Sequence, residues 1–161
     1  MDVRGRRRKK FSHLNIELPV LEQWDFQVFE AEAQGKVIRL ETDVGTKCLY
    51  IRTFSPKTVF RLFLVTEYIA QQGLKKVPRF IRTKYGEPYQ KSGRRFYWVA
   101  DWIFGRSVNP LDQNDMVKTA RKLAEFHGAS KGFYLPGEEH DVYAANNWGL
   151  MFLIWPPKLQ T

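Results

Sequence analysis

The sequence is poor in the residues that build covalent cross-links and metal sites. It has one cysteine and three histidines in 161 residues. An internal disulfide is therefore excluded, and Cys48, which lies in a strand-like pattern, is expected to be a small buried apolar residue. The histidines are scattered at His13, His127 and His140, and none forms a cluster with metal-ligand spacing. We predict no metal site.

Long apolar runs are also missing. No segment approaches the ~20 consecutive apolar residues that span a bilayer. The N-terminus is basic and lacks the apolar stretch of a secretory signal. These absences predict an intracellular protein without a membrane span. The sequence also lacks a Gly-rich phosphate loop, a Gly-x-Ser-x-Gly elbow and a dinucleotide fingerprint, which excludes the enzyme classes that depend on them.

Positive charge is abundant and unevenly distributed. Of the formal net charge of +9, the first ten residues carry +5, with one acidic residue, Asp2, against six basic ones: Arg4, Arg6, Arg7, Arg8, Lys9 and Lys10. Such a block is typical of a solvated tail, although it could also dock on an anionic surface. No aromatic residue interleaves it to stack on bases, so we do not expect nucleic-acid binding as the main function.

The first half of the chain has the pattern of an antiparallel sheet. Apolar content of 43% and aromatic content of 15% indicate a globular chain. Apolar and polar residues alternate over 24–28, 37–42 and 47–52, with turn residues at 34–35 and 43–45. Three antiparallel strands follow from this alternation.

A helix is expected next, because Ser55 and Pro56 form a good start and Gly73 a good stop. Its apolar residues recur at helical spacing and predict one buried face, made of Val59, Leu62, Phe63, Thr66 and Ile69. Glu67 lies beside this face. Further strands are predicted at 77–83 and 96–99, and the second runs into a hinge near Gly105.

The second half begins with a helix. Residues 109–115 supply cap residues, and the helix is expected to continue through Ser130. Its spacing predicts a buried face that includes a hydrogen-bonded core histidine, and this face comprises Met116, Ala120, Leu123, Ala124 and His127. The apolar run at 150–155 suits a buried strand or a patch that needs a partner.

This order of elements resembles the smaller lobe of protein-kinase-like phosphotransferases followed by the first helix of the larger lobe. Four stretches make the resemblance narrower: residues 40–49, 77–89, 101–106 and 123–132 are similar to the spore coat protein CotS family of endospore-forming bacteria. That family itself resembles aminoglycoside and choline phosphotransferases. The resemblance extends from about residue 24 to residue 149. It implies an α+β fold with an antiparallel sheet, one packed helix, a hinge, and the first helix of a truncated larger lobe.

The resemblance also implies a nucleotide site. The hinge backbone at Ala100, Asp101, Trp102 and Ile103 would contact adenine, with ATP and Mg²⁺ as the family's ligands. In such folds a strand lysine pairs with a helix glutamate and holds the phosphates. Glu67 is the glutamate candidate. However, Tyr50 stands where the lysine is expected. Arg52 lies on the same side of the strand and is the tentative substitute, whereas Lys47 lies on the opposite side.

This sequence departs from the family pattern at a second place. No His-x-Asp…Asn sequence and no Asp-centred metal motif follow the hinge, and the likeness fails after residue 149. We therefore assign no catalytic residue. The prediction is a truncated, inactive coat component or adaptor that works with other coat proteins. It would be made in the mother-cell cytoplasm, reach the spore coat and tend to self-associate.

Two alternative functions stay open. The first is a phosphotransferase whose catalytic half is missing from this chain, and the second is a basic nucleic-acid-binding module. The expected domains are a basic tail with a short segment at 1–22, a kinase-like N-terminal lobe at 23–105, and a hinge exit with an incomplete helical lobe at 106–161.

Overall fold

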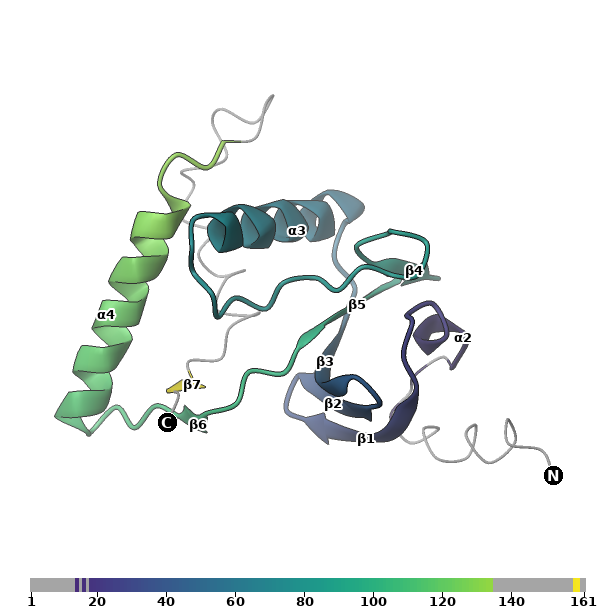
Figure 1. Cartoon of the computed structure of the whole chain (residues 1–161), viewed down its shortest axis with the longest axis horizontal. Coiled ribbons are helices and arrows are strands. Elements are labelled where there is room, and N and C mark those ends of the chain that lie inside the picture. Colours follow the sequence, from purple (N-terminus) through teal and green to yellow (C-terminus); the bar gives the residue numbers. More distant parts are fainter. Residues whose placement is uncertain (1–13, 15, 17, 135–157, 160–161) are drawn as a thin grey trace. The chain divides into compact units, whose positions relative to one another are not determined.

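The computed structural model describes residues 14, 16, 18–134 and 158–159, and its elements are labelled in Figure 1. The chain divides into two compact units. The first comprises residues up to Phe63 together with Arg79–Trp102. The second comprises Leu64–Pro78 and the residues from Ile103 onward. The basic block at 1–10 and the apolar run at 150–155 lie outside the described residues.

A five-stranded antiparallel sheet forms the first unit, in the order β1-β2-β3-β5-β4. The strands are β1 (Val28–Gln34), β2 (Val37–Thr42), β3 (Gly45–Arg52), β4 (Gln90–Ser92) and β5 (Arg95–Asp101). Gly35 and Gly45 have φ angles of 61° and 95°, in the left-handed region that tight reversals require. The predicted strands at 37–42 and 47–52 are confirmed, whereas the alternation at 24–28 that predicted the first strand overlaps β1 only at Val28.

The first strand begins later than the alternation of apolar residues predicts. Trp24 is 3% exposed and follows the short helix α2 (Leu18–Leu21), and its indole N–H donates to the carbonyl of Ile81 at 2.8 Å. The side chain is therefore anchored in the core by a loop rather than by a strand ladder. Burial alone produced the period-two signal at this residue.

The two faces of the sheet pack against different partners, as the alternation of side chains along a strand requires. One face carries Leu40, Leu49 and Val99, which cluster with Val20 and Leu21 of α2. The other face is aromatic and includes Tyr50 and Trp98. Cys48 is buried on this second face, and the prediction that it is a core residue is confirmed.

Helix α3 (Pro56–Gln71) confirms the predicted capped helix. The hydroxyl of Ser55 accepts a hydrogen bond from the Thr58 N–H at 3.1 Å, which satisfies one of the free amides of the first turn. All five predicted inner-face residues are at most 7% exposed. Periodicity therefore identified the correct face of this helix.

The predicted strand at 77–83 is wrong. Only one bridge forms there, between Ile81 and Val99. Pro78 has no N–H to donate to a ladder, and the carbonyl of Ile81 is occupied by the Trp24 indole. The Thr83 amide donates to the carbonyl of Glu87 at 2.8 Å, which closes a loop instead. The backbone groups of Ile81 and the Thr83 amide are thus satisfied without a regular strand.

In the second unit, β6 (Arg106–Ser107) pairs with β7 (Lys158–Leu159), and α4 spans Gln113–Ser130. The predicted bounds of α4 are confirmed, but its predicted buried face is wrong. Met116 and Leu123 are 46% and 43% exposed, and Ala120, Ala124 and His127 are exposed as well. His127 is therefore not a core histidine.

A narrower stripe of α4 is buried instead. Phe126 packs against Ile69 and Val77, beside the partly buried Ala129. One aromatic ring is large enough to fill the contact with the end of α3. The remaining apolar side chains of α4 are therefore not required to cover that end.

Candidate functional site

An aromatic stack occupies the face of β3 and β5 that the sequence assigns to phosphate binding. Tyr50 lies directly opposite Trp98 in the strand register, with ring centroids 5.1 Å apart and planes 2° from parallel. Phe80 stacks on Trp98 as well, at 5.3 Å and 7°. Tyr50 is 4% exposed and Trp98 is fully buried. Position 50 therefore contributes a packed ring rather than a charge.

The electrostatics of Tyr50 follow from this packing. Burial raises the pKa of the phenol, and the neighbouring Cys48 raises it further. The phenol is consequently neutral across the physiological range. A group that holds nucleotide phosphates in kinase-like folds has to be cationic, so Tyr50 lacks the charge that this role requires.

Arg52 lies two residues further along the same face of β3. One nitrogen of its guanidinium, Nη1, is already engaged, whereas Nη2 is buried without a hydrogen-bond partner among the described residues. Its Nη1 donates to the carbonyl of Lys36 at 2.6 Å and to the carbonyl of Ile51 at 2.8 Å. Burial lowers the pKa of Arg52. These bonds tie the end of β3 to the β1–β2 turn, which is a structural task. A role in phosphate binding stays a prediction.

The predicted hinge begins at the end of β5. Ala100 is fully buried, and Asp101 is exposed and forms an ion pair with Lys47 at 2.6 Å. The Trp102 amide donates to the carbonyl of Thr46 at 3.2 Å, so this backbone donor is already used within the sheet. Contact of these residues with adenine stays a prediction.

The remaining predicted site residues lie in the second unit. Ile103, the last residue of the predicted hinge, is half-buried, and Glu67 is half-buried on α3. Glu67 takes part in an interaction within the structure. Its predicted pairing with a strand cation stays a prediction.

Arg39 is a neighbour of the hinge that sequence reasoning missed. Its guanidinium lies over the Trp102 ring, 5.8 Å from the centroid, and pairs with Glu41 at 2.5 Å. Alternation along β2 places Arg39 on the same sheet face as Cys48, its cross-strand partner. That cross-strand register is the signal that could have identified it.

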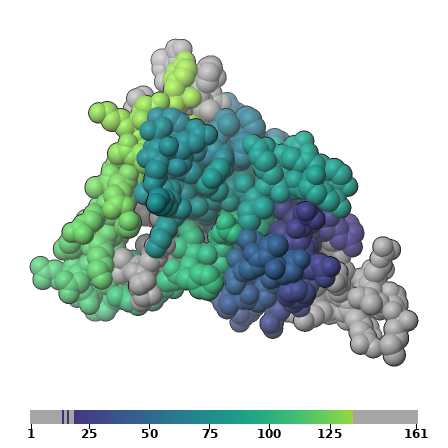
Figure 2. Space-filling model, in the orientation of Figure 1, coloured from purple at the N-terminus to yellow at the C-terminus, as the bar shows by residue number. Residues whose placement is uncertain are grey.

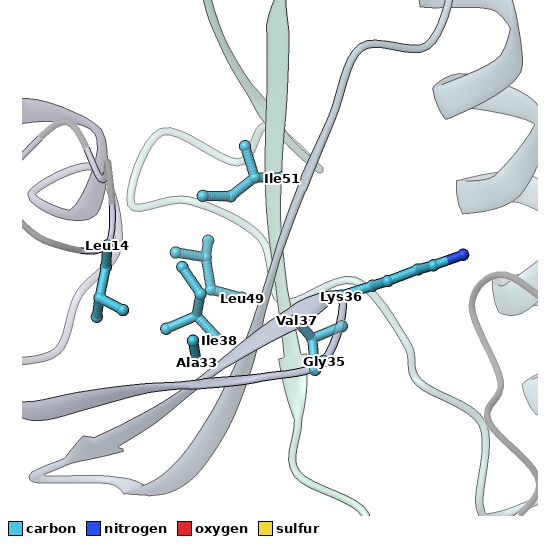
Figure 3. A pocket seen from close by; sticks show the side chains of 8 residues that line it. All are labelled: Leu14, Ala33, Gly35, Lys36, Val37, Ile38, Leu49 and Ile51. Carbon is cyan, nitrogen blue, oxygen red and sulfur yellow. The ribbon is translucent and has the colours of Figure 1, made fainter.

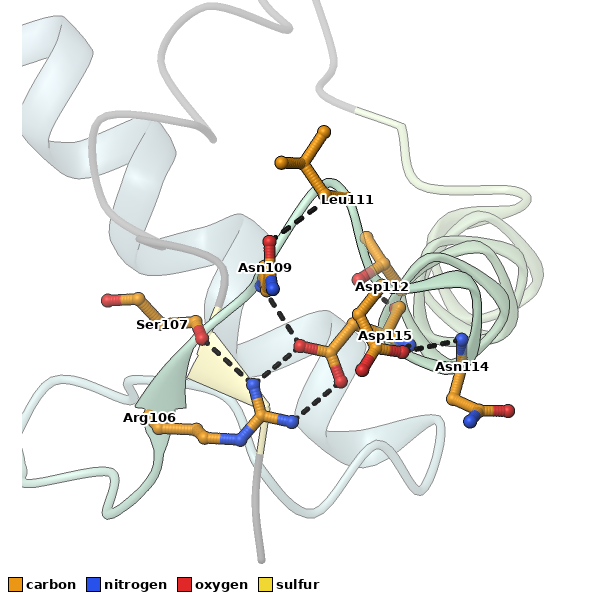
Figure 4. A network of polar contacts seen from close by, with 8 residues as sticks. Arg106, Ser107, Asn109, Leu111, Asp112, Asn114 and Asp115 are labelled. Atoms are coloured by element: carbon orange, nitrogen blue, oxygen red, sulfur yellow. Dashed lines mark hydrogen bonds and ion pairs between the residues drawn. The ribbon is translucent and has the colours of Figure 1, made fainter.

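A second polar cluster joins the hinge exit to α4 (Figure 4). Asp115 is 1% exposed and binds the Arg106 guanidinium through both carboxylate oxygens, at 2.5 and 2.7 Å. It also accepts the Asn109 amide at 2.9 Å. These hydrogen bonds, first that of Arg106, lower the pKa of Asp115 to about 2. The cluster fixes the loop before α4. Sequence reasoning had assigned residues 109–115 only to capping and Arg106 to the hinge stretch, and it had not paired Arg106 with Asp115.

The first unit also has a hollow of about 280 Å³ on the sheet face opposite the aromatic stack (Figure 3). It is lined by Leu14, Ala33, Gly35, Lys36, Val37, Ile38, Leu49 and Ile51. The side chain of Lys36 points away from the other side chains. The hollow therefore offers apolar surface without a polar side chain to orient a ligand.

Within the described ranges, no group of three or more His, Cys, Asp or Glu residues is placed to hold a metal ion. No helix among those residues combines the length and apolarity needed to cross a bilayer.

Comparison with known proteins identifies the fold. No family model matches the chain. Its structure is similar to that of an aminoglycoside phosphotransferase from Alicyclobacillus acidocaldarius, with a TM-score of 0.70 and 22% sequence identity over 86% of this chain. The fold is kinase-like. The predicted α+β class, with the antiparallel sheet of a phosphotransferase-type small lobe, is confirmed. This chain covers 40% of that neighbour's length.

Proposed function

We propose that the chain is a non-catalytic, kinase-like protein of the spore coat, related to the CotS family, that serves as a coat component or adaptor. The observation that carries the loss of catalysis is the Tyr50–Trp98 stack. The coat assignment rests on the sequence resemblance to that family. The lobe boundaries at 23–105 and 106–161 belong to the same proposal.

The physical basis is the charge at the phosphate side of the site. A buried neutral phenol occupies the expected lysine position. The two nearest basic residues of β3 are held elsewhere, because Lys47 pairs with Asp101 and Arg52 binds backbone carbonyls. A polyphosphate brought to this face would lose its hydration and would have to compete with the contacts that these two cations already make, which is unfavourable.

An ATP-dependent phosphotransferase is the second candidate, and the structural similarity to an aminoglycoside phosphotransferase favours it. In this case the chain would supply a nucleotide-binding lobe, with ATP and Mg²⁺ as ligands and the hinge at Ala100–Ile103 as the adenine contact. The nucleic-acid alternative depends on residues 1–10, which are not described, and it stays a prediction.

Titration calorimetry with Mg-ATP tests the proposal, combined with transfer of labelled γ-phosphate to an aminoglycoside, to choline and to protein. We expect neither heat of binding nor transfer. Saturable Mg-ATP binding accompanied by transfer would establish the second candidate instead. A thermal melt of the same sample shows that the chain is folded.

The coat assignment needs a separate experiment. In an endospore-forming host, a tagged copy should fractionate with the coat layer of purified spores. Its confinement to the vegetative cytoplasm would contradict the coat assignment and leave the nucleotide result unchanged.

A further inference from the structure

A rigid turn at 83–87 precedes β4 in the first unit. Thr83 closes it, because its amide donates to the carbonyl of Glu87 at 2.8 Å and its hydroxyl accepts the Tyr85 and Glu87 amides at 3.3 and 3.1 Å. Thr83 is 5% exposed. Arg82 adds a further bond, since its Nη1 donates to the carbonyl of Gly86 at 2.8 Å. The conformation of the turn is therefore fixed without a ligand.

This turn displays an aromatic ring at the surface. Tyr85 is 69% exposed, and the ammonium of Lys84 lies over its ring, 5.3 Å from the centroid. Within residues 79–95, all of which are described, no other large apolar side chain is exposed. The segment, teal to green, lies at the surface in Figure 2. With a cation over one face, the ring has its opposite face for a further planar group.

Positive charge accompanies the exposed ring. Residues 79–95 contain six basic side chains and a single acidic one. Lys84, Lys91 and Arg94 are exposed, and none of them forms an ion pair with a carboxylate among the described residues. These three cations are therefore not neutralised by the protein.

The same three cations lie close together along the chain. Lys91 is in β4, and Arg94 is in the reversal that joins β4 to β5. Ten residues separate Arg94 from Lys84, which limits their Cα atoms to about 35 Å even in an extended chain. The reversals at Gly86 and Gly93, with φ of 85° and 56°, shorten that distance. The cations and the ring thus form one surface, which we call the basic turn surface.

The composition of the basic turn surface distinguishes among anionic partners. A membrane surface is bound through apolar side chains that insert between lipids as well as through cations, and only one ring is exposed here. An acidic polypeptide supplies charge without a flat group for the ring. A nucleic-acid duplex keeps its bases stacked inside the helix. A single strand offers phosphates to the cations and open bases to the ring.

We infer that the basic turn surface binds single-stranded nucleic acid, with Tyr85 stacked on a base and Lys84, Lys91 and Arg94 at phosphates. This site differs from the nucleic-acid alternative raised by the sequence, which depends on residues 1–10. It meets the requirement that those residues fail, since an aromatic side chain lies among its cations. The inference does not depend on the proposed function.

Fluorescence anisotropy with labelled oligo-dT and oligo-U of about 12 nucleotides tests the inference. The full chain is titrated as wild type and as a variant in which the six basic residues of 1–10 are serine, so that the basic block cannot contribute. We expect saturable binding in both. In the serine variant the slope of log K against log salt should be about −2, because three phosphate contacts release counterions.

Substitutions of Tyr85 separate stacking from charge. Tyr85→Ala should weaken binding about fivefold or more, because the stacked base loses its ring. Tyr85→Phe keeps the ring and should bind like the wild type. Equal affinity of the alanine and phenylalanine variants would overturn the inference. Equal affinity for a duplex of the same length would overturn it as well.

Substitutions of the cations test the phosphate contacts in the serine variant. Lys84→Gln with Lys91→Gln and Arg94→Gln should bring the salt slope close to zero. The matched control removes the same charge from three exposed cations outside the surface, with glutamine in place of Lys36, Lys118 and Arg121. This control should keep the slope, and a thermal melt of each variant confirms that it is folded.

The remaining outcomes concern other partners. Polyglutamate and phosphatidylglycerol vesicles, each added at the same anionic charge as the oligonucleotide, should displace it only weakly. Displacement as strong as that by unlabelled oligonucleotide would overturn the inference in favour of an acidic protein or a lipid surface. Absence of binding by the wild type, binding that is lost with the basic block alone, or an equal loss of slope in the control would also overturn it.

Discussion

Replacing Tyr50 with lysine tests whether the phosphate side of the site has been converted into core. Lysine is the residue expected there from the resemblance to kinase-like proteins. In the structure its side chain would enter a position that is 4% exposed and stacked on a fully buried indole. The change therefore exchanges a packed ring for an ammonium in an apolar environment.

The magnitude follows from two contributions. Loss of the aromatic pair removes about 0.5–1.5 kcal/mol beyond area burial. Leaving a buried polar group without a partner costs about 1–3 kcal/mol, and more when the group is charged. Because the ammonium is charged, the second contribution lies at or above its upper range, and we expect Tyr50→Lys to lower the free energy of unfolding by about 2–5 kcal/mol at neutral pH. For a chain of this size that corresponds to a fall in Tm of roughly 4–20 °C.

The pH dependence distinguishes buried charge from simple loss of packing. Burial lowers a lysine pKa below its unfolded value of about 10.4. The destabilisation should therefore be largest below the lowered pKa and should shrink as pH rises toward the unfolded value. In the wild type the raised pKa of Tyr50 acts in the opposite direction. Its contribution is complete below the unfolded pKa of about 10 and is lost at higher pH.

Urea unfolding monitored by tryptophan fluorescence, between about pH 6 and pH 9, measures the pH dependence of the lysine variant against the wild type. Tyr50→Phe is the matched control, since it keeps the ring and removes only the hydroxyl, at an expected loss of about 0.5–1.5 kcal/mol. If the lysine and phenylalanine variants are equally stable, position 50 is open to solvent in solution and the argument for a filled phosphate site fails.

Three further predictions concern other residues, and each can be measured by the same unfolding assay. Trp24→Phe should be more destabilising than Trp98→Phe by about 2–4 kcal/mol. The indole N–H of Trp24 donates a hydrogen bond, whereas the indole N–H of Trp98 is buried without a partner among the described residues. Equal losses of stability in the two variants would contradict this prediction. Asp115→Asn should destabilise the chain at neutral pH. The difference in unfolding free energy from the wild type should shrink as pH falls from about 4 toward 2, because the hydrogen bonds that lower the Asp115 pKa stabilise only the ionised carboxylate. A pH-independent difference would refute the ion-pair account. Asp101→Asn should cost less than about 1 kcal/mol, since the carboxylate paired with Lys47 is 76% exposed, and a larger loss would show that this pair is not solvent-screened.

Sequence periodicity correctly predicted those helices and strands that bury a single face of their own against the core. Helix α3 is the clearest case, because its cap and its inner face follow from local residues alone. The hairpins of β1–β3 follow from alternation and from glycines at the reversals. The strand prediction for 77–83 failed because the backbone groups of Ile81 bind Trp24 and Val99, which are distant in sequence. Periodicity contains no information about such partners.

The side of β3 on which each candidate residue lies was predictable, but the contacts of those residues were not. Alternation along β3 correctly placed Tyr50 and Arg52 on one side of the strand and Lys47 on the other. It did not reveal that Arg52 turns toward the carbonyl of Lys36, since that bond depends on the conformation of the β1–β2 turn. Nor did it reveal Arg39 over Trp102, which requires knowledge of the neighbouring strand.

The aromatic stack explains why restoring one residue should not restore phosphate binding. The Trp98 ring stacks on both Tyr50 and Phe80. A lysine at position 50 would therefore meet an indole that is already packed against Phe80. Cation–π attraction of about 0.5–2 kcal/mol would then hold the ammonium against the ring rather than present it to a phosphate. Reversal therefore requires Trp98 to become smaller as well. The double change removes two core rings at once, and the loss of packing would oppose the gain of charge.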